Sequence, residues 1–154
     1  MNSARIPDDL YGEIHKAMPI LCVDLAVLLD DRILLLKRKI EPDLGRFWFP
    51  GGRLRKLESL HEGAVRIARE EVGLSVDVTG FVGYTNVIFP QDPFGHGQKT
   101  HTVSLVFSCS PVSTEVRIDG NHSEFLWWDG KQVFADIPII VRNLARKALE
   151  GGNG

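Results

Sequence analysis

One stretch of the chain, from Gly51 to Leu74, combines glycines with closely spaced carboxylates. Gly51 and Gly52 open a turn, and because glycine has no Cβ, the backbone there can approach a ligand closely. The segment that follows ends in the paired carboxylates Glu70 and Glu71. Oxygen-rich sites of this kind suit hard cations, Mg²⁺ first, and such ions also bind phosphate oxygens. The stretch therefore predicts a metal site beside a phosphate-bearing ligand.

Apolar residues alternate with the carboxylates at helical spacing, which predicts an amphipathic helix over Leu57–Val72, stopped by Gly73. When this helix is projected at about 100° per residue, four side chains share one broad sector. They are Arg66, Ile67, Glu70 and Glu71. An ordinary solvated helix face is the alternative explanation of the glutamates, and the glycine turn argues against it.

The remaining patterns indicate strands on both sides of this helix. The expected strands are Ile20–Leu29, Arg32–Lys39, Phe47–Phe49, Val76–Ile88, Thr102–Ser108 and Phe125–Trp128. A second amphipathic helix is expected over Ile139–Glu150, and residues 1–17 are expected to form an arm or a short helix. Because the helices lie between or after strands, we expect an α/β (α+β) fold, with a mixed sheet sandwiched between helices. The 154 residues fit a single domain.

Composition restricts the classes of partner. The net charge of −2 gives no bulk attraction to nucleic acid or to an anionic membrane, so we expect neither. The most apolar region, Met18–Leu36, contains four charged residues and is not expected to span a membrane. Signal-peptide character is absent at the start of the chain, and Cys22 and Cys109 lie in apolar runs typical of buried thiols. We therefore expect a cytoplasmic protein.

The stretch described first resembles the Nudix box. That motif is a glycine, five residues, a glutamate, seven residues, Arg-Glu, an aliphatic residue, any residue, Glu-Glu, any residue, a glycine and an aliphatic residue. The matching positions are Gly52, Glu58, Arg66, Glu70, Glu71, Gly73 and Leu74, and Ala68 is small where an aliphatic residue is usual. The resemblance implies the Nudix fold and a hydrolase of a nucleoside-diphosphate compound. It also implies a Mg²⁺ cofactor, with Mn²⁺ as the alternative ion.

One position departs from the motif. Ile67 stands where the family has the glutamate that follows the arginine. In typical Nudix pyrophosphohydrolases, that glutamate helps to hold several metal ions or activates the water that attacks phosphorus. Isoleucine has no lone pair for a metal and no proton chemistry. The chain is therefore expected either to be inactive or to find its base elsewhere and to need fewer metal ions.

A Nudix branch with this kind of substitution, the GDP-mannose mannosyl hydrolases, is similar to the chain over about residues 17–128. In these enzymes an aliphatic residue replaces the glutamate, and the nucleophilic water attacks the anomeric carbon of the sugar instead of phosphorus. The positions that are similar in type and spacing are Pro19, Asp24, Lys37-Arg38, the run from Gly45 to Arg53, Thr100-His101 and Asn121-His122. The resemblance therefore implies a nucleotide sugar as substrate, and GDP-mannose in particular.

The resemblance also implies roles in catalysis and metal binding. His122 would be the general base, because the branch has a glutamine-histidine pair there and histidine titrates near neutral pH. The expected metal ligands are Glu71 and the carbonyl of Gly51, with Asn121 and, in reserve, Glu70. Asn121 is one methylene shorter than the branch's glutamine, so we expect it to reach the metal directly or through a water.

Cationic residues are needed for the diphosphate. We expect Arg38 and Arg53 to bind its oxygens, because arginine forms charge-assisted and often bidentate hydrogen bonds. Asp24 is a carboxylate inside an apolar strand, so it must pair with an arginine or contact the sugar. The weaker candidates for substrate binding are Lys37, His101 and Tyr11, the last as a platform for a nucleobase.

Three functions stay open at this point. The first is hydrolysis of a nucleotide sugar at its anomeric carbon. The second is conventional Nudix cleavage of a P–O–P linkage in ADP-ribose, a nucleotide sugar or a nucleoside triphosphate, with Glu115 or Glu124 as base. The third is a non-catalytic nucleotide-binding module. The apolar N-terminal hairpin is also compatible with a homodimer, as in related enzymes.

Overall fold

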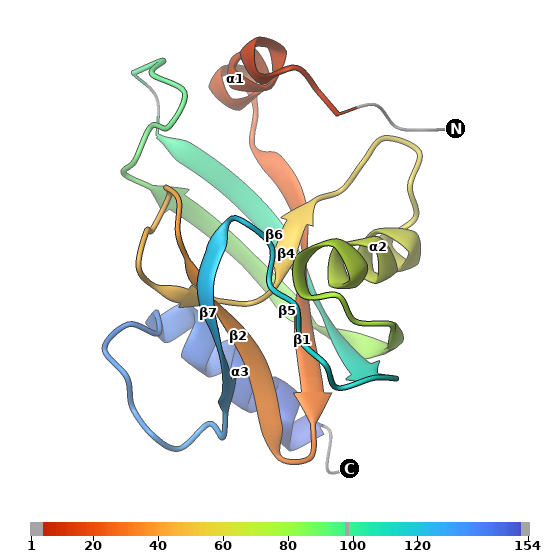
Figure 1. Ribbon diagram of the computed structural model, residues 1–154. Helices are drawn as coiled ribbons and strands as arrows, with labels where there is room; N and C mark the ends of the chain where they lie inside the picture. The colour runs from red at the N-terminus through yellow and green to blue at the C-terminus, as the bar shows by residue number, and fades with distance from the viewer. Residues whose placement is uncertain (1–4, 98, 152–154) are drawn as a thin grey trace.

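The computed structural model of the protein describes residues 5–97 and 99–151. Within them, seven strands form one mixed sheet (Figure 1). The strands are β1 (Ile20–Leu29), β2 (Arg32–Arg38), β3 (Phe47–Trp48), β4 (Gly51–Arg53), β5 (Val76–Phe89), β6 (Thr100–Pro111) and β7 (His122–Trp128). The helices of these residues are α1 (Asp8–Ala17), α2 (Leu60–Val72) and α3 (Ile139–Gly151). The expected mixed sheet between helices is confirmed.

The first strand, β1, forks the sheet. The strand order is β3-β2-β1-β6-β5, with β4 added to β1 and β7 added to β2. On one edge, β1 pairs in parallel with β6 along most of its length. On the other edge, it pairs with β4 through Cys22–Asp24 and with β2 only through Leu28–Leu29. The β4 strand and the β2–β7 ladder therefore diverge, and the candidate site lies around this divergence.

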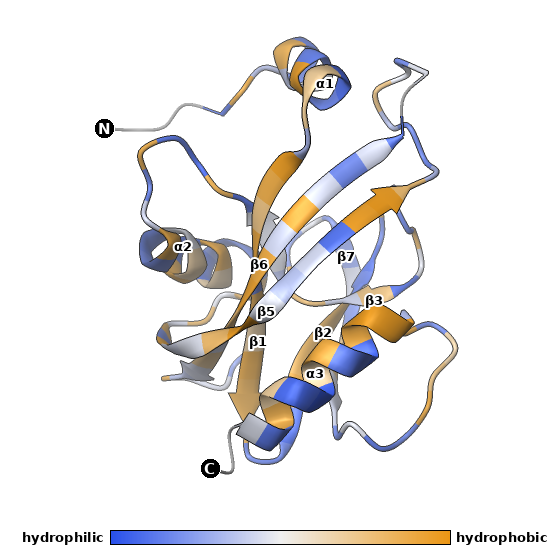
Figure 2. Ribbon diagram, turned by 180° about the vertical axis from the view of Figure 1, so that it is seen from behind, coloured by the Kyte–Doolittle hydropathy of each residue, from blue (hydrophilic) through white to orange (hydrophobic). Residues whose placement is uncertain are grey.

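Each face of the sheet has its own core. Helix α2 covers one face, where Val23 and Leu25 of β1 pack with Ile67. Helix α3 covers the opposite face, where Ala26 packs with residues of that helix (Figure 2). Strand β1 is thus buried on both sides, which explains why its sequence is almost continuously apolar. The apolar character of the N-terminal hairpin follows from burial within one chain, so it is not by itself a sign of dimerisation.

The ends of α2 are set by a serine and a glycine. The predicted start at Leu57 is wrong, because the helix begins at Leu60 behind the N-cap Ser59. The Ser59 hydroxyl accepts a hydrogen bond from the Glu62 amide, and the Glu62 carboxylate accepts one from the Ser59 amide, which is a capping box. The predicted stop at Gly73 is confirmed, with that glycine in the left-handed conformation.

Residues 8–17, within the segment expected to form an arm or a short helix, form helix α1. Residues 90–97 form a loop between β5 and β6. Strand β6 is longer than expected at both ends, because it pairs with β5 from Thr100 to Pro111. None of the helices in the part of the chain that the structure describes is long and apolar enough to cross a bilayer.

Candidate functional site

Gly51 and Gly52, predicted to open a turn, instead belong to strand β4 and lie over the last turn of α2. The amide of Gly51 donates a hydrogen bond of 3.0 Å to Oε1 of Glu71. A Cβ on Gly52 would lie 3.9 Å from the other carboxylate oxygen and 3.6 Å from Ile67, so the backbone approaches the helix closely. A Cβ on Gly51 would collide with the Asp24 carboxylate. The sequence thus needs glycine at Gly51 to let β4 pass between Asp24 and Glu71.

The turn before β7 brings a second carboxylate to Glu71. The amide of Asp119 donates to the backbone carbonyl of Glu71 at 3.0 Å. Oδ1 of Asp119 lies 2.6 Å from Nδ1 of His122, a buried side chain that is 8% exposed. One ligand atom from each of Glu71, Asp119 and His122 lies within 4.8 Å of the others. We call these three side chains the donor group.

The donor group fits a divalent cation. It combines two carboxylates with an imidazole, and carboxylate oxygens are the ligands that Mg²⁺ prefers, while imidazole also suits Mn²⁺ and heavier ions. The pKa of Glu71 is raised to about 8, mainly by burial and to a lesser extent by the charges of Asp119 and Asp24, whereas the Gly51 amide and Arg38 act against the rise. Burial therefore disfavours the ionised form of Glu71, and a bound cation would stabilise that form.

Asp24 and Arg38 lie next to the donor group. Burial raises the pKa of Asp24 to about 7, while a hydrogen bond with Ser104 and the charge of Arg38 act in the opposite direction. Arg38 is the register partner of His122 across β2 and β7. Burial lowers the pKa of Arg38, and the charges of Glu71, Asp43 and Asp24 counteract this. Arg38 is thus the cationic residue placed between these acids.

The side chains of Arg53 and Asp24 point to the same face of the sheet. In the ladder between β1 and β4, Arg53 is the partner of Cys22, and Gly51 is the partner of Asp24. The guanidinium carbon of Arg53 lies 5.9 Å from the centre of the Tyr11 ring, and its Nη1 donates to the Leu54 carbonyl at 3.1 Å. No carboxylate of residues 5–97 and 99–151 forms an ion pair with it within 4.0 Å. Its charge is therefore available to an anionic ligand.

A protein-family model described as the NUDIX domain matches residues 18–147. The chain belongs to the Nudix family of hydrolases. It is 28% identical over 122 residues to the low-salt glycan biosynthesis protein Agl8 of Haloferax volcanii, covering 79% of this chain and 78% of that protein. It is 34% identical over 110 residues to the ADP-ribose pyrophosphatase of Methanocaldococcus jannaschii, covering 70% of this chain and 61% of that enzyme.

Solved Nudix structures share the fold. The MutT Nudix hydrolase from Burkholderia pseudomallei superposes with a TM-score of 0.69 at 24% identity, covering 84% of this chain and 98% of that one. The MutT protein from Methanosarcina mazei Go1 gives a TM-score of 0.73 at 22% identity, covering 88% of this chain and 97% of that one. At these identities the likeness establishes the arrangement of helices and strands.

Two Nudix-box residues, Arg66 and Glu58, stabilise the structure around the site. Arg66 donates to both carboxylate oxygens of Glu58, at 2.6 Å and 2.8 Å, and to the carbonyl of Arg53 at 2.9 Å. Glu70 pairs with Arg66 at 3.1 Å and with Arg55 at 3.4 Å, and its side chain is 49% exposed. The structure therefore places Glu70 in a surface ion-pair network, whereas Glu71 belongs to the donor group.

The sector predicted to unite four helical side chains is divided among three environments. Arg66 and Glu70 form the ion pairs just described, and Glu71 reaches the Gly51 amide. Ile67, which is 1% exposed, lies in the core beneath Gly52. The family's glutamate position is thus occupied by a packed apolar side chain, and no carboxylate enters the site from there.

The other predicted residues have partners of their own. Asn121 is exposed, and its described contacts are through the backbone: its amide donates to Asp119 at 3.1 Å, and its carbonyl accepts from Lys39 at 2.9 Å. His101 lies 2.6 Å from the side-chain oxygen of Asn86. Lys37 forms an ion pair of 4.0 Å with Glu124. Of the predicted residues, the structure gathers Asp24, Arg38, Gly51, Glu71 and His122.

The residue that the sequence analysis missed is Asp119. It lies in the turn that precedes β7, where aspartate is common and does not by itself indicate a functional site. The signal that could have found it is the spacing of an aspartate three residues before the proposed catalytic histidine. Hydrogen bonds between residues so spaced in a turn are local, so this pairing could have been predicted.

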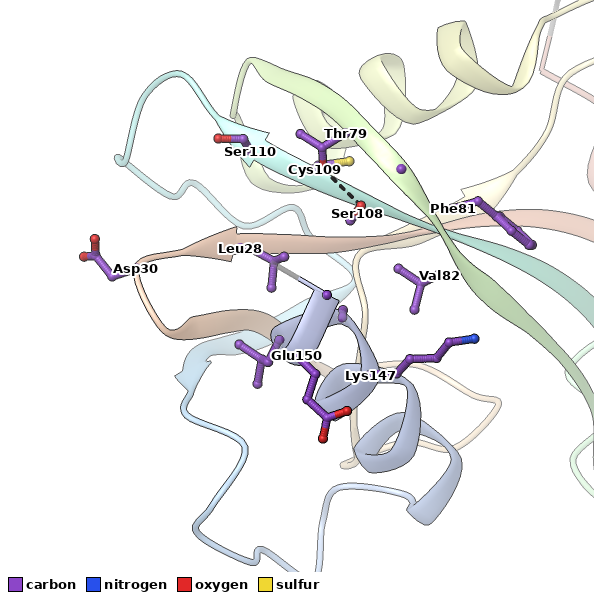
Figure 3. A pocket seen from close by; sticks show the side chains of 14 residues that line it. Leu28, Asp30, Thr79, Phe81, Val82, Ser108, Cys109, Ser110, Lys147 and Glu150 are labelled. Carbon is purple, nitrogen blue, oxygen red and sulfur yellow. Dashed lines mark hydrogen bonds between the residues drawn. The ribbon is translucent and has the colours of Figure 1, made fainter. Parts of the chain in front are cut away.

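A separate cavity lies away from these residues. It has a volume of about 870 Å³ and opens between the last turn of α3 and strands β5 and β6 (Figure 3). Leu28, Val82, Ser108 and Lys147 are among the side chains that line it, and the Thr79 and Ser108 hydroxyls are hydrogen-bonded at 2.9 Å. None of the predicted site residues lines this cavity.

Proposed function

We propose that this Nudix hydrolase cleaves a nucleotide sugar at the anomeric carbon and releases a nucleoside diphosphate and the free sugar. The observation that carries the proposal is the contact of 2.6 Å between Nδ1 of His122 and Oδ1 of Asp119. When the Asp119 carboxylate accepts from the Nδ1–H group, the lone pair of the imidazole is left on Nε2. An imidazole held in this tautomer is suited to take a proton from water.

The place of Ile67 supports a base outside the Nudix box. Ile67 is buried beneath Gly52, so the water activator of typical family members has no counterpart there. The two alternative bases are occupied elsewhere. Glu115 pairs with Arg117 at 3.3 Å on the surface, and Glu124 pairs with Lys37. His122 is the base that lies within the donor group.

The diphosphate and the metal ion have separate sets of binding residues. Arg38 and Arg53 bind the diphosphate oxygens through charge-assisted hydrogen bonds. When bound, Mg²⁺ or Mn²⁺ supplies positive charge that stabilises the departing diphosphate. Glu71, the carbonyl of Gly51 and the Asp119 oxygen not used by His122 would hold the ion.

Proton transfer then accompanies a single displacement. Nε2 of His122 takes a proton from the attacking water, the water oxygen bonds to the anomeric carbon, and the bond from that carbon to the diphosphate oxygen breaks. The diphosphate leaves with the bonding electrons. Asp24, whose carboxylate lies beside Gly51, would accept a hydrogen bond from a sugar hydroxyl. Because the water enters opposite the leaving group, the product has the inverted anomeric configuration.

Similarity to a protein named for glycan biosynthesis supports a sugar-bearing substrate. Guanine and mannose come only from the resemblance of the sequence to the GDP-mannose mannosyl hydrolases, so GDP-mannose is the first compound to test. The second candidate is cleavage of a P–O–P linkage. Similarity to an ADP-ribose pyrophosphatase favours it, although the chain spans only 61% of that enzyme.

Product identity decides between the two. The protein would be incubated with Mg²⁺ and GDP-mannose, other nucleotide sugars or ADP-ribose in ¹⁸O-labelled water, and the products weighed by mass spectrometry. We expect unlabelled nucleoside diphosphate and a sugar that carries one ¹⁸O atom, with inversion seen by NMR of fresh product. Label in a phosphate group, or release of a sugar phosphate, would show that the proposed reaction is wrong.

We also propose that the chain forms a homodimer in the cytoplasm. Strand β5 is an edge strand, and its exposed large apolar side chains are Phe81, Tyr84 and Ile88. Sedimentation equilibrium tests this, because Tyr84→Arg would shift a dimer held through this face to the monomer mass, and a monomeric parent protein would contradict it.

A further inference from the structure

Helix α1 is held against the rest of the molecule by a small group of rings. The ring of Tyr11 meets His15 edge-on at 4.6 Å and Phe94 edge-on at 5.6 Å. His15 and Phe94 lie 4.5 Å apart. We call Tyr11, His15 and Phe94 the ring cluster. Phe94 belongs to the loop of residues 90–97, so the cluster joins the N-terminal helix to the connection between β5 and β6.

A second contact strengthens this junction. Gly12 is the one described residue of α1 that is buried, and His96 of the same loop packs directly over it. His96 also lies 4.0 Å from the Glu13 carboxylate. The ring of Tyr11 is therefore fixed from two sides, by its own helix and by the 90–97 loop.

The free face of the Tyr11 ring meets Arg53. The backbone of Arg53 is fixed, because it pairs with Cys22 in β1 and its carbonyl accepts a hydrogen bond from Arg66. Its side chain is long and flexible, and it has no ion-pair partner among the described residues that would set its direction. Two groups orient it: the Leu54 carbonyl, which accepts from Nη1 at 3.1 Å, and the Tyr11 ring, whose centre lies 5.9 Å from the guanidinium carbon.

We propose that Tyr11 is a positioning residue, and that the ring cluster holds the Arg53 guanidinium in place to bind the diphosphate of the substrate. The inference rests on the role proposed above for Arg53. It assigns α1 and the 90–97 loop to the machinery of the site, although neither contacts the reacting atoms. It also gives Tyr11 a role other than that of a nucleobase platform, since its ring face is already used by Arg53.

Substitutions of Tyr11 separate positioning from packing. Tyr11→Leu removes the aromatic face, and we expect it to weaken GDP binding in the presence of Mg²⁺ about three- to tenfold. Tyr11→Phe keeps that face and should bind GDP within about twofold of the parent protein. Leu10→Ala, at an exposed neighbouring position of α1, is the matched control and should also bind normally. Binding would be measured by calorimetry, with thermal melting to show that each variant is folded.

A double-mutant cycle gives the decisive result. If Tyr11 acts through Arg53, then Tyr11→Leu should weaken GDP binding no further once Arg53→Ala is present. Independent, multiplying losses would overturn the inference while leaving the role of Arg53 intact. Normal GDP binding by Arg53→Ala, or no GDP binding by the parent protein, would overturn both. Phe94→Leu, which loosens the ring cluster without touching Arg53, should reproduce the loss, and the absence of a loss would also count against the inference.

Discussion

Nε and Nη2 of Arg66 donate hydrogen bonds of 2.6 Å and 2.8 Å to the two carboxylate oxygens of Glu58, and Nη2 also donates to the carbonyl of Arg53. The side chains of Arg66 and Glu58 are only 18% and 12% exposed. Two residues of the Nudix box therefore hold β4, which contains Gly51 and Gly52, against α2. This bracing fixes Gly51 and Arg53 relative to Glu71, and it has consequences for stability that can be measured apart from catalysis.

Glu58→Gln should destabilise the protein. The substitution keeps the shape of the side chain but removes the charge that strengthens two hydrogen bonds, so we expect the free energy of unfolding to fall by about 1–3 kcal/mol. Urea denaturation at pH 7 measures it. Glu115→Gln, in an exposed ion pair with Arg117, is the matched control and should change stability by less than about 0.5 kcal/mol. Equal effects of the two substitutions would argue against the bracing role.

The same pair predicts a dependence of stability on pH. The hydrogen bond from Arg66 holds the pKa of Glu58 below its ordinary value of 4.5. The stabilisation is therefore fully present above that value and is lost as the pH falls through the lowered pKa of the folded state. Urea midpoints measured from pH 7 down to pH 3 should drop more steeply for the parent protein than for Glu58→Gln. Parallel curves would mean that Glu58 does not titrate differently in the folded state.

His122→Asn should abolish most turnover while the substrate still binds. Asparagine can place a donor near the position of Nδ1, but it has no second nitrogen to accept a proton from water. We expect kcat to fall by about 10²–10⁴-fold, the usual contribution of a general base, with little change in GDP affinity. His61→Asn, at an exposed position of α2, is the control and should leave kcat unchanged. A loss of affinity as large as the loss of kcat would instead indicate that His122 binds metal or ligand.

Removal of one carboxylate should identify the metal site. Addition of Mg²⁺ or Mn²⁺ to metal-free protein should raise its Tm, because a ligand at about 100 times its Kd stabilises the folded state by about 2.7 kcal/mol. Glu71→Gln should lose this rise, since Glu71 belongs to the donor group. Glu70→Gln should keep it, since Glu70 pairs with Arg55 and Arg66 at the surface. The reverse result would assign the metal to Glu70.

Restoring the family's glutamate should harm the fold. Ile67 is 1% exposed within the core beneath Gly52, so Ile67→Glu would bury a carboxylate without a partner. We expect a loss of about 3–5 kcal/mol in the free energy of unfolding, against less than about 1.5 kcal/mol for Ile67→Leu. Thermal and urea unfolding of both variants would test this. A stable Ile67→Glu protein that released sugar phosphate would show that the site accepts the usual family chemistry.

Most strands and the end of α2 could be predicted, because their signals are local. Gly73 takes the left-handed conformation that its type predicts, and β1 is apolar because it is buried on both faces. The predicted start of α2 at Leu57 is wrong because Ser59 caps the helix, although the apolar pattern begins at Leu57. At both ends of α2 the deciding interaction spans only a few residues.

The parts of the site that could not be predicted depend on contacts between distant segments. Glu70 and Glu71 are neighbours in sequence, but only the packing of α2 against β4 shows which of them faces Gly51. Asp119 joins the donor group because the turn before β7 docks on the end of α2. Likewise, the contact of Tyr11 with Arg53 joins α1 to β4, two segments that are distant in the sequence.

The fork at β1 gives the bound ligand a mechanical role. Glu71 is attached to the β4 branch through Gly51, whereas Arg38 and His122 belong to the β2–β7 branch, and within the sheet the two branches are joined through β1. A cation held by Glu71, Asp119 and the carbonyl of Gly51, with a diphosphate reaching Arg38 and Arg53, would therefore link the two branches. A substrate whose phosphate chain is too short to reach both branches would leave them unlinked. The length of the phosphate chain therefore becomes a criterion of substrate selection.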